Sequence, residues 1–178
     1  MKTVKVIDKE FGLYIPQEKI ESSIQNVANQ INQDMEGMNP LFLVILNGAF
    51  MFASELFKRI TIPCEISFVK LSSYAGTETT SVVRELIGLD HPLNGRHVVI
   101  VEDIVDTGHT MRYTIQKLRD LKASDVRIAT LFFKPDNFKY TYPIDYKGME
   151  IGNEFIVGYG LDYDQQGRNL PDIYKIIE

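Results

Sequence analysis

The chain has 178 residues and a net charge of −5, with 44% hydrophobic and 24% charged residues. This length favours a single domain with a sizeable buried core, and the acidic balance, without a cluster of Lys or Arg, argues against a nucleic-acid surface. The single cysteine, Cys64, excludes an internal disulfide framework, and the apolar runs are too short to cross a membrane. We therefore expect a soluble cytoplasmic protein that binds neither nucleic acid nor membrane.

The first third of the chain alternates between strand and helix patterns. Residues 3–15 can form a short strand, and Pro16 then begins a helix, because proline is tolerated in the first helical turn. Apolar residues recur at helical spacing after it. The continuous apolar run Leu41–Leu46 is typical of a strand covered on both faces. Residues 47–49 form a tight turn, and residues 50–60 can form a second helix.

The middle of the chain continues this alternation. Residues 64–71 and 82–89 predict two strands, and the small, hydroxyl-rich residues 72–81 between them predict a mobile hairpin loop. A central strand, an amphipathic helix and a further buried strand follow at 98–101, 111–122 and 125–134. Strands that alternate with helices are typical of an α/β fold, with a central parallel sheet and helices on both faces.

Polar residues stand at the ends of three of the predicted strands. They are Asn47 and Gly48, Glu102 and Asp103, and Lys134. Ligands of parallel α/β sheets bind beyond the carboxyl ends of the strands. We therefore expect these residues to converge on one site.

The stretch His97–Met111, HVVIVEDIVDTGHTM, carries the densest chemistry. Glu102 and Asp103 are suited to accept hydrogen bonds from sugar hydroxyls and to bind Mg²⁺. In the loop 106–110, Gly108 permits a close backbone approach, and the start of the following helix offers free N–H groups to a phosphate. An ordinary helix cap would explain one polar residue of this loop but not the whole run. The stretch therefore predicts a sugar-phosphate site.

This stretch also carries a family resemblance. An apolar strand, two acids, two apolar residues and D-T-G-x-T together resemble the phosphoribosyl pyrophosphate signature of the type I phosphoribosyltransferases. The chain is similar over nearly its whole length to the hypoxanthine-guanine phosphoribosyltransferases, through LNGAFMF (46–52), KLSSYAG (70–76), FFK (132–134) and EFIVGYGLDYDQQGRNL (154–170). The resemblance implies the type I phosphoribosyltransferase fold, a central parallel sheet flanked by helices with a small hood and a flexible catalytic loop. It also implies one domain over residues 1–178, with the hood formed mainly by about 135–178 together with N-terminal residues.

The resemblance implies roles for the residues around the sugar and its phosphate. Glu102 and Asp103 would hold the ribose hydroxyls, partly through Mg²⁺, and Asp162 would be a further Mg²⁺ ligand. Asp106 would be the general base that accepts a proton from a purine ring nitrogen. The 5′-phosphate would bind the loop formed by Asp106, Thr107, Gly108, His109 and Thr110.

The purine side follows from the same resemblance. Lys134 would hydrogen-bond the exocyclic O6 of the base, and Phe155 would stack on the purine. The backbone of Ile156 would contact the edge near C2. A protein donor to O6 fits a 6-oxopurine, and stacking is worth about 1–3 kcal/mol per base.

On the pyrophosphate side, the resemblance assigns Asn47, Gly48 and Arg168 to the leaving group. The loop at Asn47 and Gly48 often contains a cis peptide in this family. Ser73 and Tyr74 would belong to the flexible loop that excludes water from the reaction.

Two positions depart from the commoner family pattern. Many relatives carry Lys or Arg where Asn47 stands, and Lys where His109 stands. Some of the leaving-group charge would then fall to backbone N–H groups, Mg²⁺ and Arg168. The phosphate site would also be less cationic, because histidine is neutral for much of the range near pH 7.

The predicted function is purine salvage by a Mg²⁺-dependent enzyme. It would combine phosphoribosyl pyrophosphate with hypoxanthine, and with guanine, to give IMP or GMP and pyrophosphate. One alternative is an enzyme of the same fold that acts on xanthine or a pyrimidine base. Another is a phosphoribosyl-pyrophosphate-sensing regulator that binds nucleic acid, which the acidic charge disfavours. The resemblance also implies a homodimer or homotetramer.

Overall fold

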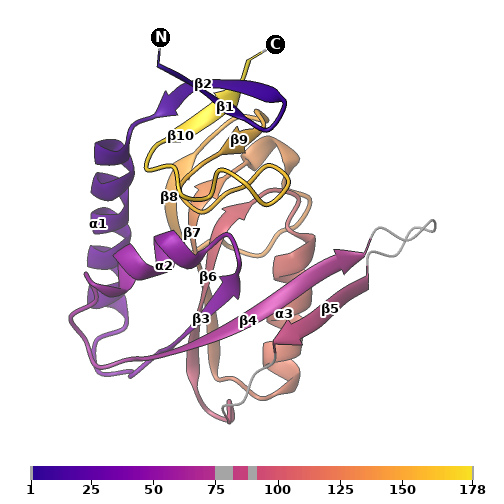
Figure 1. The fold of residues 1–178 in the computed structure, drawn as a ribbon. Coiled ribbons are helices and arrows are strands. Elements are labelled where there is room, and N and C mark those ends of the chain that lie inside the picture. The colour runs from indigo at the N-terminus through magenta and orange to yellow at the C-terminus, as the bar shows by residue number, and fades with distance from the viewer. Residues whose placement is uncertain (1, 75–81, 88–91, 178) are drawn as a thin grey trace.

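The computed structural model describes residues 2–74, 82–87 and 92–177 (Figure 1). The first half of the chain contains β1 (Thr3–Val6), β2 (Lys9–Ile15), α1 (Gln17–Asp34), β3 (Leu41–Leu46), α2 (Phe50–Phe57), β4 (Glu65–Tyr74) and β5 (Val82–Ile87). The second half contains β6 (His97–Val105), α3 (His109–Asp120), β7 (Asp125–Phe133), the short 3-10 helix η1 (Pro135–Asn137), β8 (Tyr146–Glu150), β9 (Ile156–Val157) and β10 (Ile173–Ile176).

The larger of two sheets has the strand order β5-β4-β3-β6-β7-β8. The strands from β4 to β8 in this order run parallel, and β5 pairs antiparallel with the end of β4. β3 and β6 lie at the centre and are almost entirely buried, as their apolar β-branched runs predict. The carboxyl ends of β3, β6 and β7 therefore meet at one edge of the sheet.

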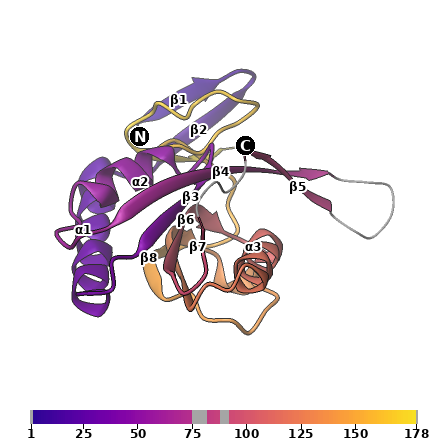
Figure 2. The ribbon, with the colours of Figure 1, turned by 90° about the horizontal axis from the view of Figure 1, so that it is seen from below.

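Helices cover both faces of this sheet (Figure 2). α1 and α2 bury their apolar stripes against one face, where Phe42 and Val44 of β3 meet the helices. α3 packs on the other face, where the alternate residues Leu41 and Leu43 point. Successive residues of a strand point to opposite faces, so a run of apolar residues contributes to the hydrophobic core on each face of the sheet. The predicted α/β class with a central parallel sheet is confirmed.

The second sheet joins the two ends of the chain in the antiparallel order β1-β2-β10-β9. β10 pairs with β2 on one side and with β9 on the other. A small core of Val6, Phe11, Val157 and Tyr174 lies beneath it. Figure 1 shows this sheet at the top of the molecule, above the carboxyl ends of the large sheet, with both termini beside it.

Two details differ from the sequence predictions. Residues 3–15 form two strands separated by a turn, in which Ile7 has a positive φ of 55°. β4 continues to Tyr74, so residues 72–74 are paired strand and not the predicted loop, because β5 supplies a partner for them. Residues 75–81 lie outside the described part of the chain. None of the described helices is both long and apolar enough to span a membrane.

Candidate active site

A cleft of about 340 Å³ opens at the carboxyl ends of β3 and β6. Its lining comes from the end of β3 and the turn after it, Leu71 of β4, the end of β6 and the loop after it, and the loop between β9 and β10. The predicted site residues that line it are Gly48, Glu102, Asp103, Asp106, Thr107, Gly108, His109, Thr110, Asp162 and Arg168. The ends of β3 and β6 therefore converge in this cleft, and Lys134 at the end of β7 contacts its lining residue Asp106.

Glu102 and Asp103 belong to β6 itself, which runs on to Val105 instead of ending before the acids. β3 pairs with β6 only as far as Val101, whereas β7 pairs with β6 to its end. Beyond Val101 the edge of β6 on the β3 side is open, and two backbone amides of this stretch are hydrogen-bonded to carboxylates of β6 itself. Glu102 Oε1 accepts a hydrogen bond from the Asp103 amide at 3.2 Å, and Asp103 Oδ1 accepts one from the Ile104 amide at 2.7 Å.

The two adjacent acids form an electrostatically strained pair. Burial raises the pKa of Glu102 well above its usual range, and the neighbouring charge of Asp103 raises it further. Burial also raises the pKa of Asp103, although its hydrogen bonds and Arg168 oppose the rise. Buried like charges favour the binding of a cation or of hydroxyl donors, and both kinds of group occur in a metal-bound sugar.

Gly48 packs against Asp103 so closely that no side chain would fit. A Cβ placed on Gly48 would stand 1.6 Å from Asp103 Oδ2, and one on Gly160 would stand 2.1 Å from the Gly48 carbonyl oxygen. Gly160 itself has a positive φ of 99°. The Leu46–Asn47 peptide is cis, in the loop where the resemblance implied such a bond. The β3–α2 turn is thus held between β6 and the C-terminal loop.

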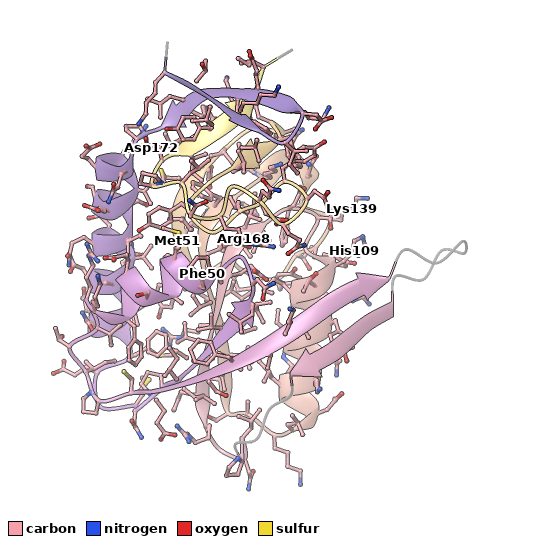
Figure 3. All side chains as sticks on the ribbon, in the orientation of Figure 1. Phe50, Met51, His109, Lys139, Arg168 and Asp172 are labelled. Atoms are coloured by element: carbon pink, nitrogen blue, oxygen red, sulfur yellow. The ribbon has the colours of Figure 1, made fainter. Side chains whose placement is uncertain are left out.

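Arg168 and Asp162 occupy the same side of the cleft (Figure 3 labels Arg168). Their side chains form an ion pair of 2.8 Å, and Arg168 Nη1 also donates to the Gly160 carbonyl at 2.8 Å. Among the described residues, no three Asp, Glu, His or Cys side chains converge as a ready metal cage. Mg²⁺ is commonly held by one or two carboxylates plus substrate phosphates, so the pair at Glu102 and Asp103 fits it as a partial donor set.

The loop after β6 forms an anion-binding start to α3. Gly108 adopts the left-handed conformation, with φ 85° and ψ 1°, and no side chain caps the helix that begins at His109. The first backbone N–H groups of a helix have no partner within the helix, and its positive dipole end faces the same way. These groups border the cleft and suit a phosphate.

Asp106 lies between this loop and the end of β7. Its Oδ2 is 3.5 Å from Lys134 Nζ, and its Oδ1 accepts a hydrogen bond of 2.8 Å from Asn137 Nδ2. Lys134 is buried and also donates to the Glu154 carbonyl at 3.1 Å. An ammonium group has three N–H donors, so one remains for a ligand. Asn137 was not predicted from the sequence, because a lone amide in a turn gives no signal.

Phe155 projects from the end of the second sheet, and 47% of it is exposed. Its ring is packed at a tilt against Phe11 (centroids 6.2 Å apart) and edge-on to Tyr163 (5.9 Å). Tyr163 donates a hydrogen bond of 2.9 Å to Asp8 in the β1–β2 turn. Ile156 is buried in β9. Phe155 is therefore an aromatic surface that is supported from behind and open in front.

A segment at residues 137–142, here called the strap, follows the loop 106–109 closely. The Lys139 amide donates to the Thr107 carbonyl at 3.2 Å, and the Tyr142 hydroxyl donates to the Gly108 carbonyl. Burial raises the pKa of Tyr142, which keeps its hydroxyl a donor. A Cβ on Gly108 would meet the rings of Phe138 and Tyr140 within 3 Å.

Four of the predicted residues whose side chains the structure describes do not line the cleft. Asn47, Lys134, Phe155 and Ile156 lie beside it, and Lys134 joins it through Asp106. Ser73 and Tyr74 have a described backbone in β4, and their side chains lie outside the described structure.

Comparison with known proteins places this site in context. Residues 14–164 match the model of the phosphoribosyl transferase domain family. The chain is 42% identical over 156 residues, 87% of each chain, to a hypoxanthine-guanine phosphoribosyltransferase from Streptococcus thermophilus. A crystal structure of a hypoxanthine phosphoribosyltransferase from Staphylococcus aureus superposes with a TM-score of 0.88 at 36% identity, covering 93% of this chain and 90% of the other. A hypoxanthine phosphoribosyl transferase from Trypanosoma cruzi, solved to study how its C-terminal region affects oligomeric state and activity, has a TM-score of 0.88 at 31% identity and covers 98% and 95%.

Proposed function

Because this chain belongs to the phosphoribosyltransferase family, we propose that it is a purine-salvage enzyme acting on hypoxanthine and guanine. It transfers the 5-phosphoribosyl group from phosphoribosyl pyrophosphate to the base, giving IMP or GMP and pyrophosphate. The observation that carries this proposal is the cleft itself. It joins a helix start for the phosphate, the buried Glu102 and the partly buried Asp103 for the ribose, and Lys134 beside Asp106 for the base.

The base side is organised by charge. Two of the three N–H groups of Lys134 Nζ point to Asp106 and to the Glu154 carbonyl. The third N–H group can donate to the exocyclic oxygen of a 6-oxopurine. Asp106 accepts the proton that leaves the purine ring nitrogen as that nitrogen bonds to the anomeric carbon. Asn137 and Lys134 hold one oxygen each of the Asp106 carboxylate, which orients the base before the substrate arrives. The exposed face of Phe155 stacks on the purine.

The leaving-group side is organised by Arg168 and by the close-packed turn at Gly48. When the carbon–oxygen bond to pyrophosphate breaks, negative charge develops on the leaving oxygen. The Arg168 guanidinium and backbone N–H groups are preorganised to meet that charge. Glu102 and Asp103, with Asp162, would hold Mg²⁺, which would supply further positive charge to the substrate.

A substrate panel tests the proposed function. The purified protein is given phosphoribosyl pyrophosphate, Mg²⁺ and one of hypoxanthine, guanine, xanthine, adenine or uracil, and nucleotide formation is followed. We expect turnover with hypoxanthine and guanine and at least about a hundredfold lower kcat/KM with adenine, which cannot accept a hydrogen bond from Lys134 at position 6. Preferred turnover of xanthine or uracil would assign the chain to a different base.

The metal requirement is tested in the same assay. Excess chelator is expected to abolish turnover, and added Mg²⁺ to restore it, because the acids at Glu102 and Asp103 otherwise repel the phosphate charge. Full turnover in excess chelator would show that the reaction does not need Mg²⁺.

Filter binding of DNA and RNA tests the alternative of a nucleic-acid-binding regulator. We expect the protein to retain neither nucleic acid on the filter.

We also propose that the chain assembles as a homodimer or homotetramer. Phe50 and Phe68, which are 45% and 43% exposed, lie with Ala53, Phe57 and Ile66 around an apolar hollow beside α2 and β4. Large exposed apolar patches are commonly protein interfaces. Light scattering on the purified protein should give the mass of two or four chains, and a monomer at micromolar concentration would contradict this.

A further inference from the structure

We propose that Tyr140 is a positioning residue for the phosphate site, because its hydroxyl holds the His109 ring so that Nε2 is presented to the 5′-phosphate. This inference rests on the proposed function, since it takes the ligand of the loop 106–110 to be a phosphate. It extends that function by assigning part of phosphate recognition to the strap, 31 residues further along the chain.

The geometry joins the two side chains directly. The Tyr140 hydroxyl lies 2.5 Å from His109 Nδ1, and the rings meet edge to face with centroids 5.4 Å apart. His109 lines the cleft. Because Nδ1 is engaged by Tyr140, Nε2 is the ring nitrogen left to a ligand in the cleft.

The proton on Nε2 follows from the chemistry of the partner. A neutral imidazole can pair with the Tyr140 hydroxyl in either direction. A phosphate anion at Nε2 favours the tautomer that carries its hydrogen on Nε2, and the Tyr140 O–H then donates to Nδ1. When the imidazole is protonated, Nδ1–H donates to the same hydroxyl oxygen, and Nε2 keeps its hydrogen. A hydroxyl can exchange these roles, so Nε2 is a hydrogen-bond donor in both states. Without the hydroxyl, a neutral ring can place its hydrogen on Nδ1 and turn a lone pair toward the phosphate.

Tyr140 is itself fixed relative to the loop. Its ring stacks on Tyr142, with centroids 5.6 Å apart and planes at 19°, and it packs against Phe138 at 6.3 Å. The Arg112 guanidinium lies 5.2 Å from its centroid. The hydroxyl of Tyr142 is bonded to the Gly108 carbonyl. The Tyr140 ring is therefore held in place relative to the loop 106–110 through Tyr142.

Charged groups on the elements packed at this corner are Arg112 of α3, Lys139 of the strap and Asp106 of the loop. Figure 3 labels His109 and Lys139, both near the start of α3. These charges are present in the wild type and in a Tyr140→Phe variant alike. A difference between the two proteins in the pH dependence of phosphate binding therefore reports on the Tyr140–His109 contact.

The test measures binding of ribose 5-phosphate by calorimetry at pH 6.0 and pH 8.5, together with steady-state kinetics. Tyr140→Phe keeps the ring packing and removes only the hydroxyl. We expect its affinity for ribose 5-phosphate to fall about tenfold at pH 8.5, the worth of one hydrogen bond to a charged group, and less than about twofold at pH 6.0. The KM for phosphoribosyl pyrophosphate should rise in parallel, with kcat and the hypoxanthine KM unchanged, because the phosphate is held equally in the ground and transition states.

A double-mutant cycle separates positioning from general structure. Combined with His109→Ala, Tyr140→Phe should have no further effect on ribose 5-phosphate affinity. Tyr113→Phe, which changes an exposed tyrosine elsewhere on α3, is the matched control and should bind as the wild type does.

Equal losses at both pH values, or losses that add in the double variant, would overturn the inference. Normal ribose 5-phosphate binding by Tyr140→Phe in an enzyme that turns over hypoxanthine would also overturn it and leave the proposed function standing. A wild-type protein that neither binds ribose 5-phosphate nor turns over would overturn both.

Discussion

The carboxylate of Asp106 contacts two neighbouring side chains, Asn137 and Lys134. One oxygen takes the Asn137 amide hydrogen, and the other faces the Lys134 ammonium at 3.5 Å. The buried Lys134 side chain faces Asp106 and donates to the Glu154 backbone carbonyl, the kind of pairing that a buried cationic group requires. The carboxylate is therefore oriented without being fully neutralised, which suits a general base.

Replacing Asp106 with Asn tests that role. The change keeps the shape and a hydrogen-bonding oxygen but removes the proton acceptor, so kcat should fall by about 10²–10⁴-fold, with a small change in the KM for phosphoribosyl pyrophosphate. Steady-state kinetics measure both values. Asp136→Asn, an exposed carboxylate near the start of the strap, is the control that should keep wild-type rates. An unchanged kcat in Asp106→Asn would contradict the assignment.

Phe155→Ala addresses the purine side. Loss of a stacking surface worth about 1–3 kcal/mol should raise the hypoxanthine KM by about 10–100-fold. The KM for phosphoribosyl pyrophosphate serves as the internal control and should stay within about twofold. An unaltered hypoxanthine KM would show that the exposed ring of Phe155 does not stack on the purine.

Candidate site residues could be predicted from the sequence where they lie close together along the chain. The run from Glu102 to Thr110 places acids, hydroxyls and glycine within nine positions, so its purpose is readable without the fold. Asn137 and Tyr140 were not found because each acts on a residue 31 positions away. Their types are common in turns, and nothing local separates them from neighbours that only solvate the chain.

At the scale of elements, the site depends on where strands stop pairing. β3 leaves β6 after Val101, so the last part of β6 has one open edge that faces the cleft. The β3–α2 turn then passes across this opening, with Gly48 against the Asp103 carboxylate. Glu102 and Asp103 border the cleft because β3 stops pairing with β6 early, and the turn is close because Gly48 lacks a side chain.

Gly48→Ala tests this contact. A Cβ would stand 1.6 Å from Asp103 Oδ2, so the turn or the carboxylate must shift, and kcat/KM should fall by at least about 100-fold. The free energy of unfolding should drop by about 1–3 kcal/mol, as measured by urea melts. Gly37→Ala is the control: its positive φ of 76° also disfavours alanine, but its surroundings are empty, so it should lose stability and keep activity.

The long elements were predictable and the short ones were not. α1, β3, α3 and β7 were expected within a few residues of their observed bounds, because their apolar periodicity extends over several turns or a full buried strand. β8, β9 and β10 were missed. β9 has two residues, and β10 owes its conformation to β2 at the other end of the chain. Such short strands form because a neighbouring strand pairs with them, and their own sequence has no strong strand pattern.

At the scale of the whole molecule, Asp172 ties distant parts together (labelled in Figure 3). It receives hydrogen bonds from Lys2 Nζ at 2.6 Å, from the Gln17 amide at 2.9 Å and from the Tyr174 hydroxyl at 3.0 Å. The first residues, the start of α1 and β10 thereby share one carboxylate. These contacts, with Lys2 the largest, hold the pKa of Asp172 below its usual range.

The pH dependence of stability follows from that direction. A carboxyl whose pKa is lowered by folding stabilises the protein above its unfolded pKa of about 3.9 and loses this effect as the pH falls through the folded value. Asp172→Asn should reduce the unfolding free energy by about 2 kcal/mol at pH 7, and the gap to wild type should narrow below about pH 4. Urea melts across this range measure it. Asp120→Asn on the exposed side of α3 should change stability by less than about 0.5 kcal/mol.

The pairing of β10 with β2 has a consequence for synthesis on the ribosome. Chains fold as they emerge, from the N-terminus onward, and the parallel sheet has all its strands once Glu150 is made. The β1–β2 hairpin, although made first, has its second partner only when residues 173–176 appear. Until then it carries an open edge, of the kind that pairs with other chains. A nascent chain can thus form the loop 106–110 early, whereas the surface that carries Phe155 is completed only after residues 173–176 have been translated.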